Sequence, residues 1–293
     1  MDWDDLKIFL AIARDGQILG AARRLALNHA TVARRLDRLE LTLGERLFLR
    51  RSGGCELTAA GTALLPRAER VEAELLAAEA SARSAGGQLT GTVRIGAPDG
   101  FGTAFLAPRL WRLLDGQPRL TLQLVPVARA FSLSRREADL AITVEKPDQG
   151  RLVSRKLVTY GLGLYAARGY LASHGEPKDA EALARHRLIG HVDDLVYSRS
   201  LHYAEDAGLR WQADYEISSA VGQVEAVAAG GGIGILHHFM ARGRADLQRL
   251  LPEIAIARTY WLVTHQSTAN PAAVRHVADG IRDLVNDERA VFA

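Results

Sequence analysis

Residues 17–57 read QILGAARRLALNHATVARRLDRLELTLGERLFLRRSGGCEL, and this stretch decides how the N-terminal part of the chain folds. Its spacing predicts a helix over 28–43 with one apolar stripe. At about 3.6 residues per turn the members of that stripe share one buried face. They recur at intervals of 4, 3 and 4 residues: Val32, Leu36, Leu39 and Leu43.

The opposite face of this helix starts with small residues and then presents charge, at Ala30, Ala33, Arg34 and Asp37. Such a face near a helix N-terminus fits a DNA major groove. Asn28 is a suitable N-cap. A shorter helix over 20–25 precedes it after a tight turn at 26–27. This order is typical of a helix-turn-helix, and an ordinary helical hairpin in a bundle is the alternative.

A basic hairpin follows directly. The run 47–49 (LFL) suits a short strand, the turn after it holds Arg50 and Arg51, and 56–58 leads back. A hairpin in this position predicts a wing that contacts phosphate or the minor groove. Between Arg23 and Arg51, eight arginines stand against three acids, a local charge of +5 where the whole chain has +3. A local excess of this kind indicates a nucleic-acid surface.

Composition favours a protein of ordinary globular type. The 293 residues suit two or three domains, and 48% hydrophobic and 24% charged content are usual for globular chains. The start MDWDDLK lacks a signal-peptide pattern and no apolar run approaches a membrane span, so we expect a cytoplasmic protein without membrane contact. The single cysteine, Cys55, excludes an internal disulfide and a cysteine-based metal cluster, and a redox role for it is the weaker interpretation.

A first helix over 4–14 is expected to pack under the helix-turn-helix. Residues 58–85 predict one long helix with an unbroken heptad seam. A partner helix from a second copy would bury this seam, and packing along its own domain is the alternative. Residues 84–91 (SAGGQLTG) predict a flexible hinge. The seam has the members Leu64, Ala68, Val71, Leu75, Ala78 and Ala82.

From residue 92 strand patterns alternate with helix patterns, which predicts an α/β domain with a mainly parallel sheet. The stretch 157–167 predicts two strand-like halves around Gly161 and Gly163. Helices are expected at 132–138, 218–229 and 271–285. The strand runs are VRIGA (93–97), LTLQLV (120–125), DLAITV (139–144), GGGIGIL (230–236) and TYWLVTH (259–265).

Two strings, LKIFLAIARDGQILGAARRLALNHATVARRLDRLELTLGERLFLRR (6–51) and LTAAGTALL (57–65), closely resemble the LysR-type transcriptional regulators. A weaker match continues through VRIGA, ADLAITV and AVAAGGGIGIL. The resemblance implies a winged helix-turn-helix at 1–60, a long linker and dimerisation helix with hinge at 61–91, and an effector-binding domain at 92–293.

That last domain would resemble periplasmic binding proteins, with two α/β lobes. Lobe I is expected at about 92–161 and 266–293, and lobe II at about 162–265, with crossover segments near 161–164 and 264–266. The family usually assembles as dimers of dimers.

The chain departs from the family pattern at two places in the DNA-reading unit. Gln17, Ile18 and Leu19 stand where the family often has Ser, Phe and Thr, so a phosphate contact from a Thr hydroxyl is lost. The run 28–30 is Asn-His-Ala instead of the frequent Ser-Gln-Pro, which predicts a different preferred DNA sequence. Further on, 237–238 is His-His where Pro often follows the strand.

The expected DNA contacts come from the helix face and the wing. Arg34 either pairs with guanine, worth about 1–3 kcal/mol of discrimination, or holds a phosphate. Arg50 and Arg51 are phosphate candidates, and a solvated turn is their alternative. The full set is Asn28, His29, Ala30, Thr31, Ala33, Arg34, Arg35, Arg50 and Arg51.

The effector site is expected in the cleft between lobes, at helix N-termini that follow strands. Asp99 would repel a carboxylate unless Arg129 points inward. Ser218 or Ser219 is equally well explained as an N-cap. Lone histidines at 191, 202 and 237 are further candidates, although a lone His is more often structural. The named set is Asp99, Gly100, Thr103, Arg129, Ser132, Ser218 and Ser219.

These patterns predict a ligand-controlled transcription factor that binds inverted-repeat promoter DNA as a dimer or dimer of dimers. We expect a homodimer through 61–85 and a homotetramer, with carboxylates and aromatics as the effector classes to test first and RNA polymerase as a candidate partner. No catalytic residue, metal ligand or cofactor is expected.

Two alternatives stay open. One is an α/β-domain enzyme acting on a small metabolite with an accessory DNA-binding domain. However, the run 230–234 (GGGIG) enters a strand instead of leaving one, so it does not fit a dinucleotide fingerprint. The other is a nucleoid-type binder without a ligand, for which a large α/β domain would be unnecessary.

Overall fold

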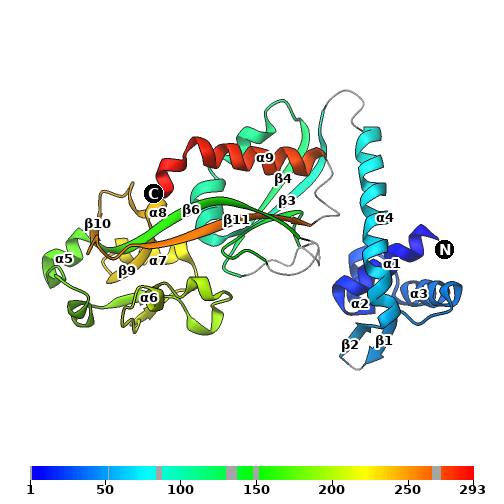
Figure 1. Cartoon of the computed structure of the whole chain (residues 1–293), viewed down its shortest axis with the longest axis horizontal. Helices are drawn as coiled ribbons and strands as arrows, with labels where there is room; N and C mark the ends of the chain where they lie inside the picture. The colour runs from blue at the N-terminus through cyan, green and yellow to red at the C-terminus, as the bar shows by residue number, and fades with distance from the viewer. Residues whose placement is uncertain (1, 52, 84–87, 130–136, 148–151, 266–271) are drawn as a thin grey trace. The chain divides into compact units, whose positions relative to one another are not determined.

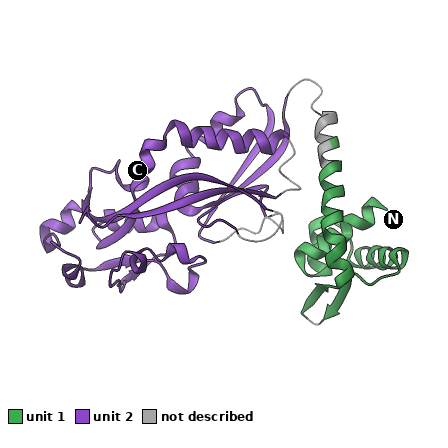
Figure 2. Cartoon of the chain, viewed as in Figure 1, with its two compact units in different colours: residues 1–87, 134–136, 267–271 green, residues 88–133, 137–266, 272–293 purple. Residues whose placement is uncertain are grey.

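The computed structural model describes residues 2–51, 53–83, 88–129, 137–147, 152–265 and 272–293. They form two compact units, one of the described residues up to Arg83 and one of those from Gln88 onward (Figure 2). Within the described ranges, no helix is both long and apolar enough to cross a bilayer.

The smaller unit is a winged helix-turn-helix followed by a long helix, as predicted (Figure 1). Phe9, Leu36 and Leu39 have no exposed surface, and the Phe9 ring lies 5.4 Å from that of Phe48. Its elements are α1 (Trp3–Asp15), α2 (Ile18–Leu25), α3 (His29–Leu43), β1 (Phe48–Arg51), β2 (Gly54–Leu57) and α4 (Ala59–Arg83).

The predicted apolar stripe on α3 is buried over most of its length. Val32, Leu36 and Leu39 are fully buried, whereas Leu43 is 38% exposed. The burial predicted for Leu43 is therefore wrong. Every residue from 41 to 44 is exposed, so the last turn of α3 extends past the core.

The turn of the helix-turn-helix is tight because Ala26 adopts a left-handed backbone with φ of +52°. The Leu27 N–H donates to the Ala22 carbonyl at 2.9 Å and closes the end of α2. The Asn28 side chain accepts the Ala30 N–H at 2.9 Å and caps α3. The predicted N-cap is confirmed by this hydrogen bond.

A buried carboxylate on α3 holds the start of the wing. Glu40 is only 5% exposed, and its Oε1 accepts the backbone N–H groups of Leu47 at 2.8 Å and Phe48 at 3.3 Å. Its Oε2 accepts Arg46 Nη1 at 2.9 Å. A buried carboxylate is tolerated when each oxygen is hydrogen-bonded, so Glu40 fixes where the wing leaves the helix.

The predicted heptad seam on the long helix α4 differs in burial between its first and second halves. Ala68 is buried and Leu64 packs on the core of its own unit. Farther along, Val71 and Leu75 are 43% and 38% exposed. Packing within the unit therefore accounts for the first half of the seam and leaves apolar side chains of the second half facing solvent.

The larger unit is an α/β domain. Its strands are β3 (Thr90–Pro98), β4 (Arg119–Val127), β5 (Leu140–Thr143), β6 (Leu152–Ala167), β7 (Leu188–Gly190), β8 (Tyr215–Glu216), β9 (Ile233–His237), β10 (Leu247–Leu250) and β11 (Ile256–His265). Its α-helices are α5 (Arg168–His174), α6 (Tyr203–Asp206), α7 (Ala220–Ala228), α8 (His238–Ala241) and α9 (Ala272–Asp287). Shorter helical segments are η1 (Phe101–Leu106), η2 (Leu110–Leu114), η3 (Glu181–Arg185), η4 (Asp193–Leu195), η5 (Arg199–Leu201) and η6 (Arg289–Phe292).

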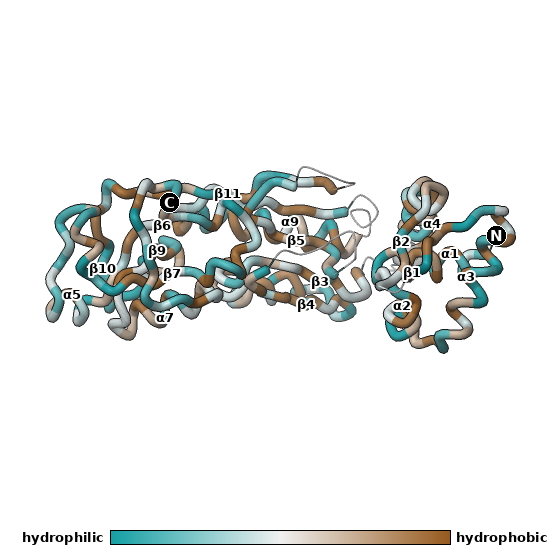
Figure 3. The backbone as a smooth tube through the Cα atoms, turned by 90° about the horizontal axis from the view of Figure 1, so that it is seen from below, coloured by the Kyte–Doolittle hydropathy of each residue, from teal (hydrophilic) through white to brown (hydrophobic). Residues whose placement is uncertain are grey.

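The sheet is mixed, which corrects the mainly parallel sheet expected from the sequence. Its order is β4-β3-β5-β11-β6-β9-β7-β8, with β10 on β6. Strands pair in parallel within β4-β3-β5 and within β9-β7-β8, whereas β6 and β11 pair antiparallel with all their neighbours. In Figure 3 the tube is largely hydrophobic along β5, whose first three residues are buried.

β6 is one continuous strand, so the two halves predicted around the glycines are wrong. The glycines are needed because the His238 ring packs against the strand backbone there. A Cβ on Gly161 would lie 2.5 Å from His238 Cδ2, and one on Gly163 would lie 2.9 Å from Cε1. The glycines therefore mark a close approach of a side chain and not a strand end.

β6 and β11 run from one lobe to the other (Figure 1). Residues 162–166 of β6 pair with β9, and residues 261–264 of β11 pair with β5. On β11 the pairing with β6 has a register shift between Tyr260 and Trp261, and the crossover segments expected near 161–164 and 264–266 stay predictions. Most of the helix predicted at 132–138 and part of the hinge at 84–91 lie outside the described residues.

Replacing Glu40 by Ala is expected to lower the free energy of unfolding of the smaller unit by roughly 2–4 kcal/mol, because two buried N–H groups lose their acceptor. Glu45→Ala, a change of an exposed carboxylate next to the wing, serves as the control. Urea unfolding followed by circular dichroism measures both. Equal stability of the two variants would contradict the role of Glu40.

Candidate functional site

The predicted DNA contacts are exposed or partly exposed on the solvent side of α3 and on the wing. Asn28, His29, Ala30 and Arg34 are exposed at the start of α3, and Thr31, Ala33 and Arg35 are partly exposed. Arg50 and Arg51 are exposed on β1 of the wing. Because this face is opposite the buried stripe, α3 can present it to a groove without disturbing the core.

Most arginines near this face are held by carboxylates. Arg35 pairs with Asp4 at 3.1 Å, Arg50 with Asp37 at 2.5 Å, and Arg51 with Glu56 at 3.0 Å. Exposed pairs of this kind are worth about 0–1 kcal/mol, so a phosphate can displace the carboxylate at little cost.

Arg34 differs from these arginines. Among the described residues it makes no ion pair and no side-chain hydrogen bond, and its side chain is exposed one turn into α3. Its guanidinium is therefore free to bind an external acceptor. The sequence did not reveal that Asp37, on the same face, ties the wing to α3 through Arg50.

A second candidate site is a cleft in the larger unit. It lies between the ends of strands from one lobe and the loops and helices of the other. Its lining is Pro98, Asp99, Gly100, Ala128, Val144, His191, Val192, Leu195, Val196, Tyr197, Leu201, Tyr203, Ser218, Ala220, His237 and Tyr260. The largely apolar and aromatic lining with a few polar groups suits a small organic ligand.

Asp99 joins the lobes across this cleft. It follows β3, and its Oδ2 accepts the Ser219 hydroxyl at 2.6 Å and the Val221 N–H at 3.2 Å. Ser219 is the N-cap of α7 and also accepts the Gly222 N–H at 3.1 Å. The N-cap interpretation of Ser219 is therefore correct, and the same hydroxyl donates to the opposite lobe.

Burial keeps the aromatic and imidazole groups of the cleft uncharged. Burial lowers the pKa of His237 to about 3, with smaller contributions from His191 and His238. Burial also lowers the pKa of His191. Tyr197 has its pKa raised to about 12 by burial and by the charges of Glu145 and Asp99. At neutral pH these side chains are hydrogen-bonding neutral groups.

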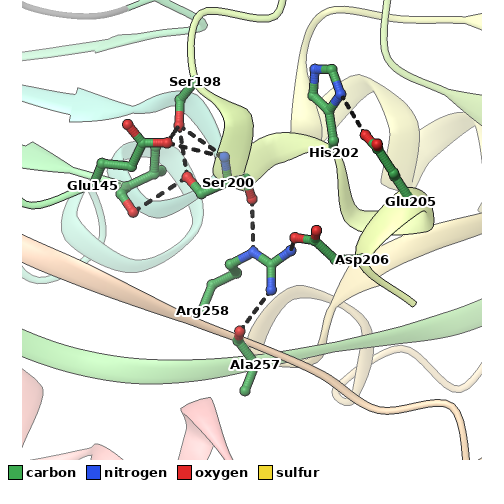
Figure 4. Close-up of polar contacts among 9 residues, drawn as sticks. Glu145, Ser198, Ser200, His202, Glu205, Asp206, Ala257 and Arg258 are labelled. Atoms are coloured by element: carbon green, nitrogen blue, oxygen red, sulfur yellow. Dashed lines mark hydrogen bonds and ion pairs between the residues drawn. The ribbon is translucent and has the colours of Figure 1, made fainter. Parts of the chain in front are cut away.

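The 193–206 segment, which forms one wall of the cleft, is fixed by polar contacts from both sides (Figure 4). Glu145 accepts the Ser198 hydroxyl and the Ser200 N–H, the latter at 3.0 Å, and these contacts lower the pKa of its carboxyl. Arg258 on β11 donates to the Ser200 carbonyl at 2.8 Å and pairs with Asp206. The wall is therefore attached to both lobes.

The predicted effector residues are only partly brought together. Asp99, Gly100 and Ser218 line the cleft. Thr103 is exposed and is not part of the lining. Arg129 pairs with Glu137 at 2.9 Å and lines a neighbouring hollow with Glu145 and Ser198. Ser132 lies outside the described residues.

Two of the three candidate histidines, His191 and His237, line the cleft. His202 instead lines an adjacent hollow and lies 3.4 Å from Glu205. Tyr197, which lines the cleft, and Glu145, which holds its wall, were not predicted from the sequence. A carboxylate directly after the DLAITV strand was the available signal for Glu145, whereas Tyr197 lies in a stretch without clear periodicity.

Acidification from pH 7 to pH 5 is expected to destabilise the larger unit. The folded pKa of His237 lies below that of an unfolded histidine, so the unfolded chain binds the proton first. The contribution of neutral His237 to the free energy of unfolding is fully present above about pH 6.5. It decreases as the pH is lowered, and at pH 5 about 2 kcal/mol of it is lost.

His237→Phe keeps a ring and should remove this share of the pH dependence. His202→Gln, which changes an exposed imidazole, should leave it. Urea unfolding at pH 7, 6 and 5 provides the measurement, and an unchanged slope in His237→Phe would refute the assignment.

Two family models match the chain. One, described as the LysR substrate binding domain, matches residues 86–286. The other, described as the bacterial regulatory helix-turn-helix protein of the lysR family, matches residues 3–62. They coincide with the larger unit and with the winged helix-turn-helix.

Among similar proteins, the Mau operon transcriptional activator of Paracoccus denitrificans is 33% identical over 292 residues, covering 97% of this chain and 96% of its own length. The HTH-type transcriptional regulator CrgA of Neisseria meningitidis serogroup C (strain 8013) is 30% identical over 190 residues, 65% of this chain. The matched region spans 64% of the length of CrgA. An HTH-type transcriptional regulator of Xanthomonas campestris is 32% identical, and the matched region spans 57% of the length of that regulator.

Solved structures share the fold. CrgA from Neisseria meningitidis has a TM-score of 0.60 at 24% identity, covering 97% of this chain and 99% of its own. ArgP from Mycobacterium tuberculosis has a TM-score of 0.69 at 20% identity, covering 97% of each chain. From the two family models and the near full-length relative, the chain belongs to the LysR family of bacterial regulatory helix-turn-helix proteins.

Proposed function

We propose that this protein is a ligand-responsive transcriptional regulator that binds inverted-repeat promoter DNA as a dimer or dimer of dimers. The exposed start of α3 carries the proposal, because Arg34 is free of protein partners among the described residues while His29 and Ala30 face solvent beside it. Membership of the LysR family supports the same function.

In this proposal α3 reads the major groove. The small side chains of Ala30 and Ala33 let the helix approach the bases, and Arg34 donates to a base edge. Arg50 and Arg51 exchange their carboxylate partners for DNA phosphates, which positions the wing without selecting a sequence. The local excess of arginine adds a strong dependence of affinity on salt.

The larger unit supplies the response to a ligand. Its cleft is lined by both lobes, so an effector that contacts Asp99 on one side and the 193–206 segment on the other favours one lobe arrangement. A ligand shifts such an equilibrium only by its different affinity for the two arrangements. We propose that this shift alters promoter binding by the protein.

The enzyme alternative has less support. Neither His191 nor His237 hydrogen-bonds to a serine or cysteine among the described residues, so the cleft there lacks the paired base and nucleophile of a hydrolase. The relatives named above are regulators. We therefore propose a non-catalytic protein that acts in the cytoplasm, with RNA polymerase as a further partner at the promoter.

Gel shifts across a range of salt concentrations test this function, using the DNA upstream of the protein's own gene and random DNA of equal length. The wild-type protein should prefer the upstream fragment. Arg34→Ala should relax the preference at one base pair by about 1–3 kcal/mol. Arg51→Ala, the matched control, should weaken all sites alike and reduce the salt slope by about 1.

Equal affinity of the wild-type protein for upstream and random DNA would refute the regulator. Unchanged binding of Arg34→Ala on every site would refute only the role of this arginine.

The exposed half of the α4 seam predicts self-association. Leu75→Glu places a charge on the apolar stripe and should weaken the dimer by at least tenfold, whereas Glu74→Gln on the neighbouring exposed position should not. Sedimentation velocity of the full chain at micromolar concentration measures the change. A wild-type protein that stays monomeric would contradict this use of the seam.

A further inference from the structure

The cleft of the larger unit is acidic. Among the lining residues that the structure describes, Asp99 alone has a carboxylate, and none is a lysine or arginine. Apart from Ser218, the remaining described lining is apolar or aromatic, with Val144, Leu195 and Tyr197 among its members. A carboxylate ligand would therefore meet a like charge, and the described lining residues offer no cation to offset it.

The two histidines of the wall do not change this balance. His237 is fully buried, and burial lowers its pKa to about 3, so it is neutral at pH 7. The pKa of His191 is lowered in the same direction. Arg129, the nearest basic residue suggested by the sequence, pairs with Glu137 and is not part of the lining.

Asp99 is held in a definite position by only one of its oxygens. Oδ2 accepts both the Ser219 hydroxyl at 2.6 Å and the Val221 N–H at 3.2 Å, at the N-terminus of α7. Among the described residues no hydrogen bond reaches Oδ1. A fixed carboxylate with an open acceptor, in a half-buried wall, favours a donor from a ligand.

The opposite wall is also fixed, so the cleft keeps its shape around this acceptor. Glu145 holds the 193–206 segment from one lobe and Arg258 holds it from β11 (Figure 4). Tyr203, on this segment, is 5% exposed. Aromatic rings near a cation add a favourable interaction, and apolar side chains accommodate a compact hydrocarbon body.

We propose that Asp99 determines effector specificity, and that the cleft takes a small, largely apolar or aromatic molecule that carries a protonated amine. The ammonium group donates to Asp99 Oδ1 while Oδ2 stays on α7, so the ligand is bonded through Asp99 to the second lobe. This inference rests on the proposed function, in which the cleft is the effector site. Of the two effector classes expected from the sequence, it retains aromatics and excludes carboxylates.

Matched probe series test the proposal on the full-length protein. The amines are butylamine, benzylamine and 2-phenylethylamine, and the acids with comparable carbon skeletons are butyrate, benzoate and phenylacetate. Thermal unfolding identifies the best amine, and titration calorimetry at pH 7 then compares it with its matched acid. At least one amine should bind at least tenfold more tightly than that acid.

Asp99→Asn should reduce affinity for that amine at least tenfold, because the ammonium loses a charged acceptor. Asp115→Asn, which changes an exposed carboxylate of the same unit outside the cleft, should leave the affinity unchanged. The comparison of amine with acid in the wild-type protein does not depend on the folding of either variant.

Tighter binding of the acids than of the amines would overturn the proposal, and so would the absence of binding by every amine. Amine binding that survives Asp99→Asn in a folded protein would also overturn it. The gel shift on upstream and random DNA is a separate measurement, so a failure here is distinguishable from a failure of the proposed regulator.

Discussion

The antiparallel pairing of β11 with β6 is the constraint on which the larger unit depends. It extends from Ile256 opposite Leu162 to His265 opposite Leu152, and it carries both strands through both lobes. On one side of the register shift β11 also pairs with β5. On the other side β6 also pairs with β9. The two lobes therefore share one hydrogen-bonded sheet, and a change in their angle must be absorbed by these two strands.

Two carboxylates add hydrogen bonds between the lobes. Asp99 and Glu145 each follow a strand of one lobe, and each accepts a serine hydroxyl and a backbone N–H from the other lobe. Hydrogen bonds to a charged acceptor are among the strong ones in proteins. The hydrogen bonds of Asp99 thus join the two lobes at the cleft and also fix a negative charge in its wall. The contact between the lobes is therefore linked to the kind of ligand that the cleft accepts.

In the smaller unit, buried and exposed charged side chains have different roles. The buried Glu40 is bound to the wing backbone and belongs to the fold, whereas the exposed pairs of Arg35, Arg50 and Arg51 are weak and exchangeable. Arg34 stands apart because the described residues offer it no partner. The same local excess of arginine therefore contains residues that position the wing and, on α3, a residue available for reading a base.

The sequence by itself determined the elements that depend on local periodicity and capping. These are α3 with its stripe and Asn28 cap, the wing, the long helix and the alternation of strands and helices, because side-chain spacing reports which face is buried. It also predicted Asp99, Gly100 and Ser218, since strand ends and helix starts meet at one edge. The tertiary structure decided what depends on residues far apart in the chain: the continuity of β6, the carboxylate partners of Arg35 and Arg50, the exposure of Thr103 and the entry of Tyr197 into the cleft. No local pattern encodes which distant acceptor a charged side chain reaches, so the charge of the cleft emerged only once both lobes were in place.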